Sequence, residues 1–72
     1  MKYTIKIYLN GIHWDNSYAD NEAEAESIKS YIEDESRSVW DRVNEGVLID
    51  FVELYNVQCV ERIKVTTEII ED

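Results

Sequence analysis

The segment around Asn10-Gly11 constrains the fold of this chain more than any other feature of the sequence. Apolar and polar residues alternate over residues 2–9, which is the period of a strand with one buried face. Asn-Gly is the strongest short-range signal for a two-residue hairpin turn, because both of its residues tolerate positive φ. A second alternating segment follows over residues 12–19. The sequence therefore predicts an antiparallel β-hairpin at the start of the chain.

The position of the turn also predicts the register of this hairpin. The expected pairs on the apolar face are Leu9 with Ile12, Ile7 with Trp14 and Tyr3 with Tyr18, and those on the polar face are Lys6 with Asp15 and Thr4 with Ser17. An opposite-charge pair and a hydroxyl pair are typical cross-strand partners. The apolar face then needs a second element to cover it.

Residues 20–45 have the spacing of one long, two-sided helix that can supply this cover. Residues three and four apart share a face of a helix, and here they form an apolar stripe: Ala25, Ile28, Ile32, Ser36, Val39 and Val43. Asp20 or Asn21 can cap the first free N–H groups, and Asn21-x-x-Glu24 is typical of a capping box. Gly46 predicts the C-terminal cap. Two shorter helices, interrupted at residues 36–38, are the alternative.

The opposite side of this predicted helix is acidic. It carries Glu22, Glu26, Glu33, Asp34 and Asp41, with Arg37 among them. The formal net charge of the chain is −9, and residues 20–45 hold −6 of it, whereas residues 1–19 carry +1. Such a charge repels a phosphate backbone or an anionic membrane. We therefore expect no direct binding to nucleic acid and no membrane association.

Residues 47–55 and 57–70 are rich in β-branched and aromatic side chains, which favour strands. Apolar residues lie on both sides of the first of these segments. A helix over residues 48–63 is an alternative, because the residues Leu48, Val52, Tyr55 and Cys59 also fit helical spacing. The final residues, Glu71 and Asp72, are expected to fray.

The predicted order is β-β-α-β-β, an α+β domain with an antiparallel sheet of about four strands and one long helix packed across one face. With 72 residues, the chain is predicted to form a single domain, residues 1–72. Its one cysteine excludes an internal disulfide, which is typical of a cytoplasmic protein. The alternation of residues 2–9 differs from the continuous apolar core of a signal peptide.

The residues that could carry catalysis form no recognisable motif. His13 and Asp15 share a strand face, but two ligands without a third make no metal site. Cys59 lies on the apolar face of a predicted strand, which favours a small core residue over a nucleophile. Paired carboxylates are explained by a solvated helix face. We therefore predict no enzyme activity, no metal and no cofactor.

Two functions from different classes fit this sequence. The first is an acidic protein-binding module that inhibits or regulates a basic, nucleic-acid-binding protein through the five acids of the helix. Small acidic inhibitors from phages and mobile elements are similar in size and charge. The second is an assembly domain that forms a homodimer through its sheet, with the charge serving solubility. Its candidate apolar surface consists of Tyr8, Trp40, Leu48, Val52, Leu54 and Val60.

Overall fold

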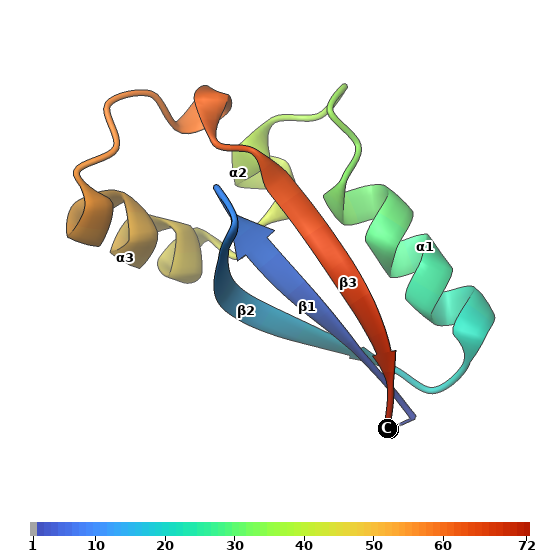
Figure 1. The fold of residues 1–72 in the computed structure, drawn as a ribbon. Helices are drawn as coiled ribbons and strands as arrows, with labels where there is room; N and C mark the ends of the chain where they lie inside the picture. Colours follow the sequence, from blue (N-terminus) through green and yellow to red (C-terminus); the bar gives the residue numbers. More distant parts are fainter. Residues whose placement is uncertain (1) are drawn as a thin grey trace.

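The computed structural model describes residues 2–72 of the chain. The elements in chain order are β1 (Tyr3–Leu9), β2 (Ile12–Ala19), α1 (Glu22–Ile32), α2 (Val39–Arg42), α3 (Glu45–Tyr55), the short 3-10 helix η1 (Val60–Arg62) and β3 (Val65–Glu71). The strands form one antiparallel sheet in the order β2-β1-β3 (Figure 1). The α+β class and the N-terminal hairpin are confirmed. The prediction of four strands and one long helix is wrong.

A bulge in β2 changes the predicted register of the hairpin. Leu9 pairs with Ile12 as expected, but Ile7 pairs with Asp15, because the register shifts between Ile7 and Tyr8. Trp14 is the extra residue, so all later pairs are displaced by one position. Lys6 therefore pairs with Asn16, and Thr4 pairs with Tyr18. The predicted pairs of Lys6 with Asp15 and of Thr4 with Ser17 are wrong.

The bulge directs the Trp14 side chain away from the ladder and toward α3. Its indole Nε1 donates a 2.8 Å hydrogen bond to the backbone oxygen of Val47. The ring centroid lies 5.2 Å from that of Phe51, edge to face, and 5.8 Å from that of Tyr55. Aromatic pairs in this geometry add stabilisation beyond their buried area. Trp14 thus joins β2 to α3.

The predicted helix over residues 20–45 is divided by residues that compete for helical hydrogen bonds. Asn21 caps α1 as expected, its Oδ1 accepting from the amide of Glu24 at 2.8 Å. Beyond the end of α1, the carboxylate of Asp34 accepts from both the amide and the hydroxyl of Ser36. The Ser38 side chain then caps α2. Short polar side chains favour such local bonds over a continuing helix, so the interrupted alternative is the one that the chain adopts.

Residues 47–55 form a helix, and the strand prediction for them is wrong. Asn44 caps α3 by accepting from the amide of Val47 at 3.2 Å, and Gly46 lies inside this helix, where it caps nothing. Leu48 and Phe51 are fully buried, three residues apart on the inner face. Burial of a side chain such as Phe51 stabilises the fold by ~1.5–3 kcal/mol. The helix ends at Asn56, which is left-handed with φ 51°.

The core lies between the helices and the sheet face that carries Ile5, Ile7 and Leu9. Ile5 packs with Ala19 and Ala25 beneath the first half of α1. The larger cluster gathers nearer the hairpin turn and consists of Ile7, Leu9, Ile32, Val39, Val43, Leu48, Phe51, Ile63 and Val65. Figure 1 shows α1 and α3 on either side of the strands, with α2 between them.

Candidate acidic surface and groove

The five acids predicted to line one helix face lie on separate segments. Glu22 and Glu26 are exposed on α1, and Asp41 is exposed on α2. Glu33 is the C-cap of α1, and Asp34 begins the loop that follows. The structure therefore brings only Glu22 and Glu26 together on one helical face, because the predicted row required an unbroken helix.

Glu33 is directed toward the sheet and bonded to it. Its Oε2 accepts from the amide of Thr67 at 2.8 Å, from the Thr67 hydroxyl at 2.9 Å and from Nζ of Lys29 at 3.2 Å. Partial burial alone would raise the pKa of Glu33, but the bonds from Thr67 and Lys29 outweigh it and hold this pKa below its ordinary value. A carboxylate held in this way serves the fold and is not free for a partner.

Asp34 is engaged in its own loop. Hydrogen bonds from Ser36 lower the pKa of Asp34, and the nearby guanidinium groups of Arg37 and Arg42 lower it further. Nε of Arg37 lies 3.5 Å from Asp34 Oδ2, and the same guanidinium stacks over the ring of Tyr31 at 5.2 Å. The negative charge of Asp34 is therefore partly compensated.

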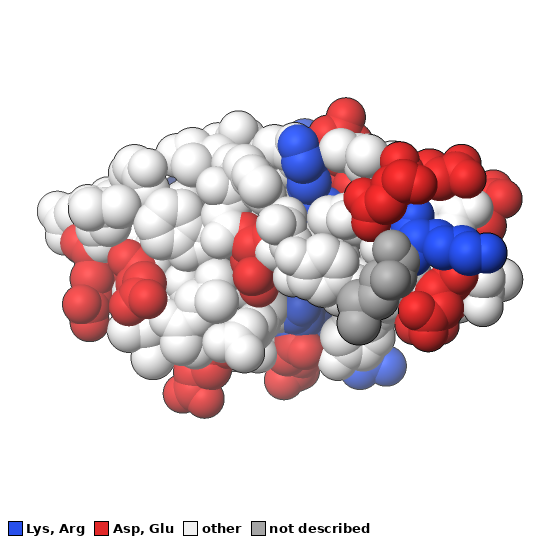
Figure 2. Space-filling model, turned by 90° about the horizontal axis from the view of Figure 1, so that it is seen from below, with Lys and Arg blue, Asp and Glu red and all other residues white. Residues whose placement is uncertain are grey.

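Glu22 and Glu26 instead join acids from the C-terminus of the chain. Together with Asp20, Glu71 and Asp72, which are also exposed, they form a surface that we call the acidic end. Tyr3 pairs with both Ala19 and Glu71, so the chain leading into α1 and the end of β3 lie at the same end of the sheet. Asp72 is held in place, because its amide donates to the backbone oxygen of Lys2 at 2.7 Å and its carboxylate accepts from the Thr4 hydroxyl. Figure 2 shows acidic side chains gathered around this end of the molecule.

Acids of both segments affect the pKa of Tyr3. Desolvation raises this pKa, and the carboxylates of Glu71 and Glu22 raise it further. Glu71 belongs to β3 and Asp72 follows that strand directly, so the prediction that both fray is wrong. Ile69 and Ile70 lie within β3, and the pairing of Tyr3 with Glu71 carries this strand one residue beyond its predicted end.

The predicted apolar surface does not form on the sheet. Leu48 is fully buried, and Val52 and Val60 pack against the core. Leu54 is 67% exposed on α3 and Trp40 is 43% exposed on α2, while Tyr8 lies on the sheet. The predicted surface required a strand over residues 47–55, whereas Leu48, Val52 and Leu54 belong to α3.

The outer face of the sheet is polar and internally bonded. The Tyr8 hydroxyl donates to Glu68 at 3.0 Å, which raises the pKa of Tyr8. His13 Nε2 and Asn16 Oδ1 lie 2.7 Å apart, and the rings of His13 and Tyr8 are 5.5 Å apart. Cys59 is exposed at the start of η1, so its assignment to the core is wrong. Among residues 2–72, no group of three potential metal ligands converges.

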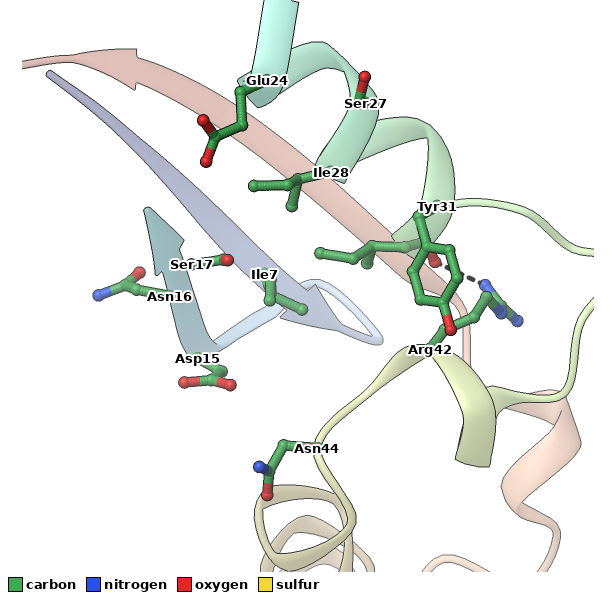
Figure 3. Close-up of a pocket in the computed structure, with 11 residues that line it drawn as sticks. Ile7, Asp15, Asn16, Ser17, Glu24, Ser27, Ile28, Tyr31, Arg42 and Asn44 are labelled. Carbon is green, nitrogen blue, oxygen red and sulfur yellow. Dashed lines mark hydrogen bonds between the residues drawn. The ribbon is translucent and has the colours of Figure 1, made fainter. Parts of the chain in front are cut away.

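A groove of about 440 Å³ lies on the inner face beside β2, between α1 and the segment that leads into α3 (Figure 3). Ile7, Ile28 and Ile32 form its apolar part. Its polar lining consists of Asp15, Asn16, Ser17, Glu24, Ser27, Tyr31, Arg42 and Asn44. Figure 3 shows the side chains of Ser17, Glu24 and Ile28 directed toward the shared space, whereas Asn16 points away from it. Sequence reasoning missed this groove, because the bulge that turns Asp15 and Ser17 inward carries no local signal.

The charged groups of the groove differ in their partners. Nη1 of Arg42 donates to the backbone oxygen of Ile32 at 2.9 Å, and its Nε donates to that of Arg37 at 3.1 Å. Asp15 and Glu24 make no hydrogen bond or ion pair with another side chain in the described part of the chain. The groove thus offers two unpaired carboxylates beside an apolar floor.

A second groove of about 430 Å³ collects most of the positive charge. It is lined by Glu35, Arg37, Arg42, Glu61, Arg62, Ile63, Lys64 and Val65. Four of the seven basic residues of the chain line this groove. The other three basic residues are Lys2, Lys6 and Lys29.

Comparison of the chain with protein-family models, curated proteins and solved structures yields no match. Within residues 2–72, no helix is both long enough and apolar enough to cross a membrane.

Proposed function

We propose that this chain is a non-enzymatic protein-binding module that inhibits or regulates a basic, nucleic-acid-binding protein. Its carboxylates would occupy the partner's basic surface in place of phosphates. The observation that supports this proposal most directly is the acidic end, where α1 and the C-terminal strand bring five acids together. Charge complementarity of this kind steers encounter and selects the partner.

The distribution of charge over the surface supports the same function. Thirteen of the sixteen acids are exposed. Two of the seven bases, Lys29 and Arg42, are directed at backbone oxygens of the chain itself. The acids are therefore less compensated at the surface than the formal charge suggests, and long-range attraction of a basic partner is favoured at low salt.

Charge reversal at the acidic end tests this function against mere solubility. A partner is first captured from the native host at low salt and its affinity is then measured with purified proteins. The variant Glu22→Lys with Glu26→Lys is expected to weaken binding at least tenfold. The control variant, Asp50→Lys with Glu53→Lys on α3, changes the net charge equally at exposed sites elsewhere.

The control separates a local surface from a general charge effect. If both variants weaken binding by the same factor, the charge acts on the whole molecule and the acidic end has no special role. A partner that stays bound in high salt, with no loss in either variant, would contradict the proposal altogether.

A further inference from the structure

We propose that the groove beside β2 receives a lysine or arginine side chain of the basic partner, carried on an extended segment that pairs with the free edge of β2. The basic chemistry of the partner rests on the proposed function. The position of the bound segment is inferred from the groove, and its pairing with β2 is inferred from the geometry of the sheet. Addition of a strand to an open sheet edge is a recurring mode of peptide recognition, in which alternate side chains enter pockets.

Along the edge of β2 that faces away from β1, the backbone hydrogen-bonding groups pair with no other strand among the described residues. The amide of Asn10 donates to the Lys64 oxygen at 2.8 Å, and that of Asp72 donates to the Lys2 oxygen at 2.7 Å. The backbone N–H and C=O groups of even-numbered residues along β1 therefore face β3. Because these groups alternate in direction along a strand, those of the odd-numbered residues of β1 face β2. Since Ile5 pairs with Ser17, the backbone groups of Asn16 and Tyr18 are directed outward.

The other sheet edge is obstructed at its centre. The amide of Thr67 in β3 donates to Glu33, and its backbone oxygen accepts from Lys29 at 3.4 Å. A strand approaching β3 would have to displace the side chains of Lys29 on α1 and of Glu33, the C-cap of this helix. Within the described residues, β2 pairs only with β1. An added strand is therefore directed to β2.

The groove lies where side chains of such a strand would point. Asp15 and Ser17 pair with Ile7 and Ile5, so they share the inner face with these residues. A residue placed opposite Ser17 would share that face too, because directly opposed residues of a ladder project to one side. Its side chain would then enter the space between β2 and Glu24 seen in Figure 3.

The lining fits a long cationic side chain. Lysine and arginine combine an apolar stem with a charged tip, so the stem can lie on Ile7 and Ile28 while the tip reaches the carboxylates. Asp15 and Glu24 are free to accept from it. Arg42 also lines the groove and keeps its positive charge, but its Nη1 and Nε donate to the backbone oxygens of Ile32 and Arg37, and within the described residues it forms no ion pair with Asp15 or Glu24. An acidic side chain would meet repulsion instead.

Peptide binding tests the groove without knowledge of the natural partner. The probe is a fluorescein-labelled peptide, acetyl-Thr-Val-Thr-Lys-Thr-Val-Thr-amide, measured by fluorescence anisotropy. Its match is the same peptide with norleucine in place of lysine, which keeps the stem and removes the charge. The wild-type chain is expected to bind the lysine peptide at least tenfold more tightly than the norleucine peptide.

Matched variants test whether Asp15 and Glu24 cause the preference for the lysine peptide. Asp15→Asn with Glu24→Gln is expected to bind both peptides equally, within about twofold. Asp50→Asn with Glu53→Gln removes the same charge from exposed sites on α3, outside both the groove and the acidic end, and is expected to keep at least fivefold preference for lysine. If both variants lose the preference to the same extent, the attraction is general and the groove proposal is overturned.

N-methylation of the peptide tests the pairing with β2. Methyl groups on one alternate set of amides are expected to abolish binding, whereas methyl groups on the other set leave it within about threefold, because only one set faces the strand. Equal binding of both methylated peptides would overturn the strand addition. If the groove variant keeps the lysine preference while the acidic-end reversal loses the natural partner, the groove proposal fails and the proposed function stands.

Discussion

The two edges of the sheet differ in whether neighbouring side chains occupy their backbone hydrogen-bonding groups. At β3, Glu33 and Lys29 occupy the hydrogen-bonding groups of Thr67 and so cover the middle of the edge. At β2, the bulge at Trp14 anchors the strand to α3 but leaves the outer backbone of Asn16 and Tyr18 open. Natural sheets usually obstruct edges that would otherwise pair with another chain. The edge at β2 is thus anchored by Trp14 and yet left open.

The largest effect is expected when the anchor of the open edge is removed. Trp14→Ala loses the contacts with Phe51 and Tyr55 and the bond to Val47, and it leaves a cavity between β2 and α3. We expect the free energy of unfolding to fall by about 3 kcal/mol, the lower end of the range for large aromatic residues. Urea denaturation followed by circular dichroism measures this change.

The other tryptophan provides the control for this prediction. Trp40 is 43% exposed on α2, so Trp40→Ala should cost about 1 kcal/mol or less. A loss at Trp14 no larger than that at Trp40 would show that β2 does not depend on α3 for its position.

A smaller effect is expected when the covered edge is opened. Glu33→Ala removes an acceptor that takes bonds from the Thr67 amide, the Thr67 hydroxyl and Lys29. Hydrogen bonds to a charged group contribute about 1.5–3 kcal/mol when they are protected from water, and Glu33 is about one third exposed, so we expect a loss of about 1.5 kcal/mol. Amide hydrogen exchange at Thr67 should accelerate roughly tenfold, since ~1.4 kcal/mol corresponds to a factor of ten.

Glu35→Ala serves as the matched control for the covered edge. Glu35 is exposed two residues further along the chain. Its removal should leave exchange at Thr67 unchanged. If exchange at Thr67 is equally fast in the wild type and in Glu33→Ala, the carboxylate does not protect β3, and the difference between the two edges disappears.

What the sequence predicts correctly is local, and what it misses depends on contacts between distant residues. Asn10-Gly11 specifies the hairpin through turn chemistry alone, and Asn21 specifies the start of α1 through its cap. The bulge at Trp14 directs the indole to α3, which begins more than 30 residues later and whose Val47 oxygen accepts from Trp14 Nε1. No short pattern around residue 14 contains that information.

Residues 47–55 show why composition misleads in a small domain. Their β-branched residues favour a strand by propensity, but Asn44 caps the segment and Leu48 and Phe51 share a buried helical face. The whole scale of β-propensities spans only about 1 kcal/mol, so burial of Leu48 and Phe51 in the tertiary structure outweighs it. The same error placed the predicted apolar surface on the sheet. In the candidate site, Glu22 and Glu26 could be identified from the helix pattern, whereas Glu71 and Asp72 could not, because only the sheet register brings them to α1.

The smallest expected effect concerns the response of the covered edge to pH. The pKa of Glu33 is lowered in the folded protein, because the bonds from Thr67 and Lys29 outweigh the effect of partial burial. A group of this kind contributes stability that is fully present above its unfolded pKa and is lost as the pH falls through the folded pKa. For Glu33 the loss therefore begins as the pH falls below its ordinary value of 4.5.

The variant Glu33→Gln isolates this contribution from the other acids, which also titrate as the pH falls. Urea denaturation between pH 7 and pH 3 should show the wild type more stable than Glu33→Gln at pH 7, with the difference shrinking at acidic pH. Asp34, whose pKa is also lowered, is present in both proteins, so its titration cancels in the comparison. A difference that stays constant from pH 7 to pH 3 would mean that charge on Glu33 contributes nothing. The cover of β3 would then depend on the shape of the side chain alone.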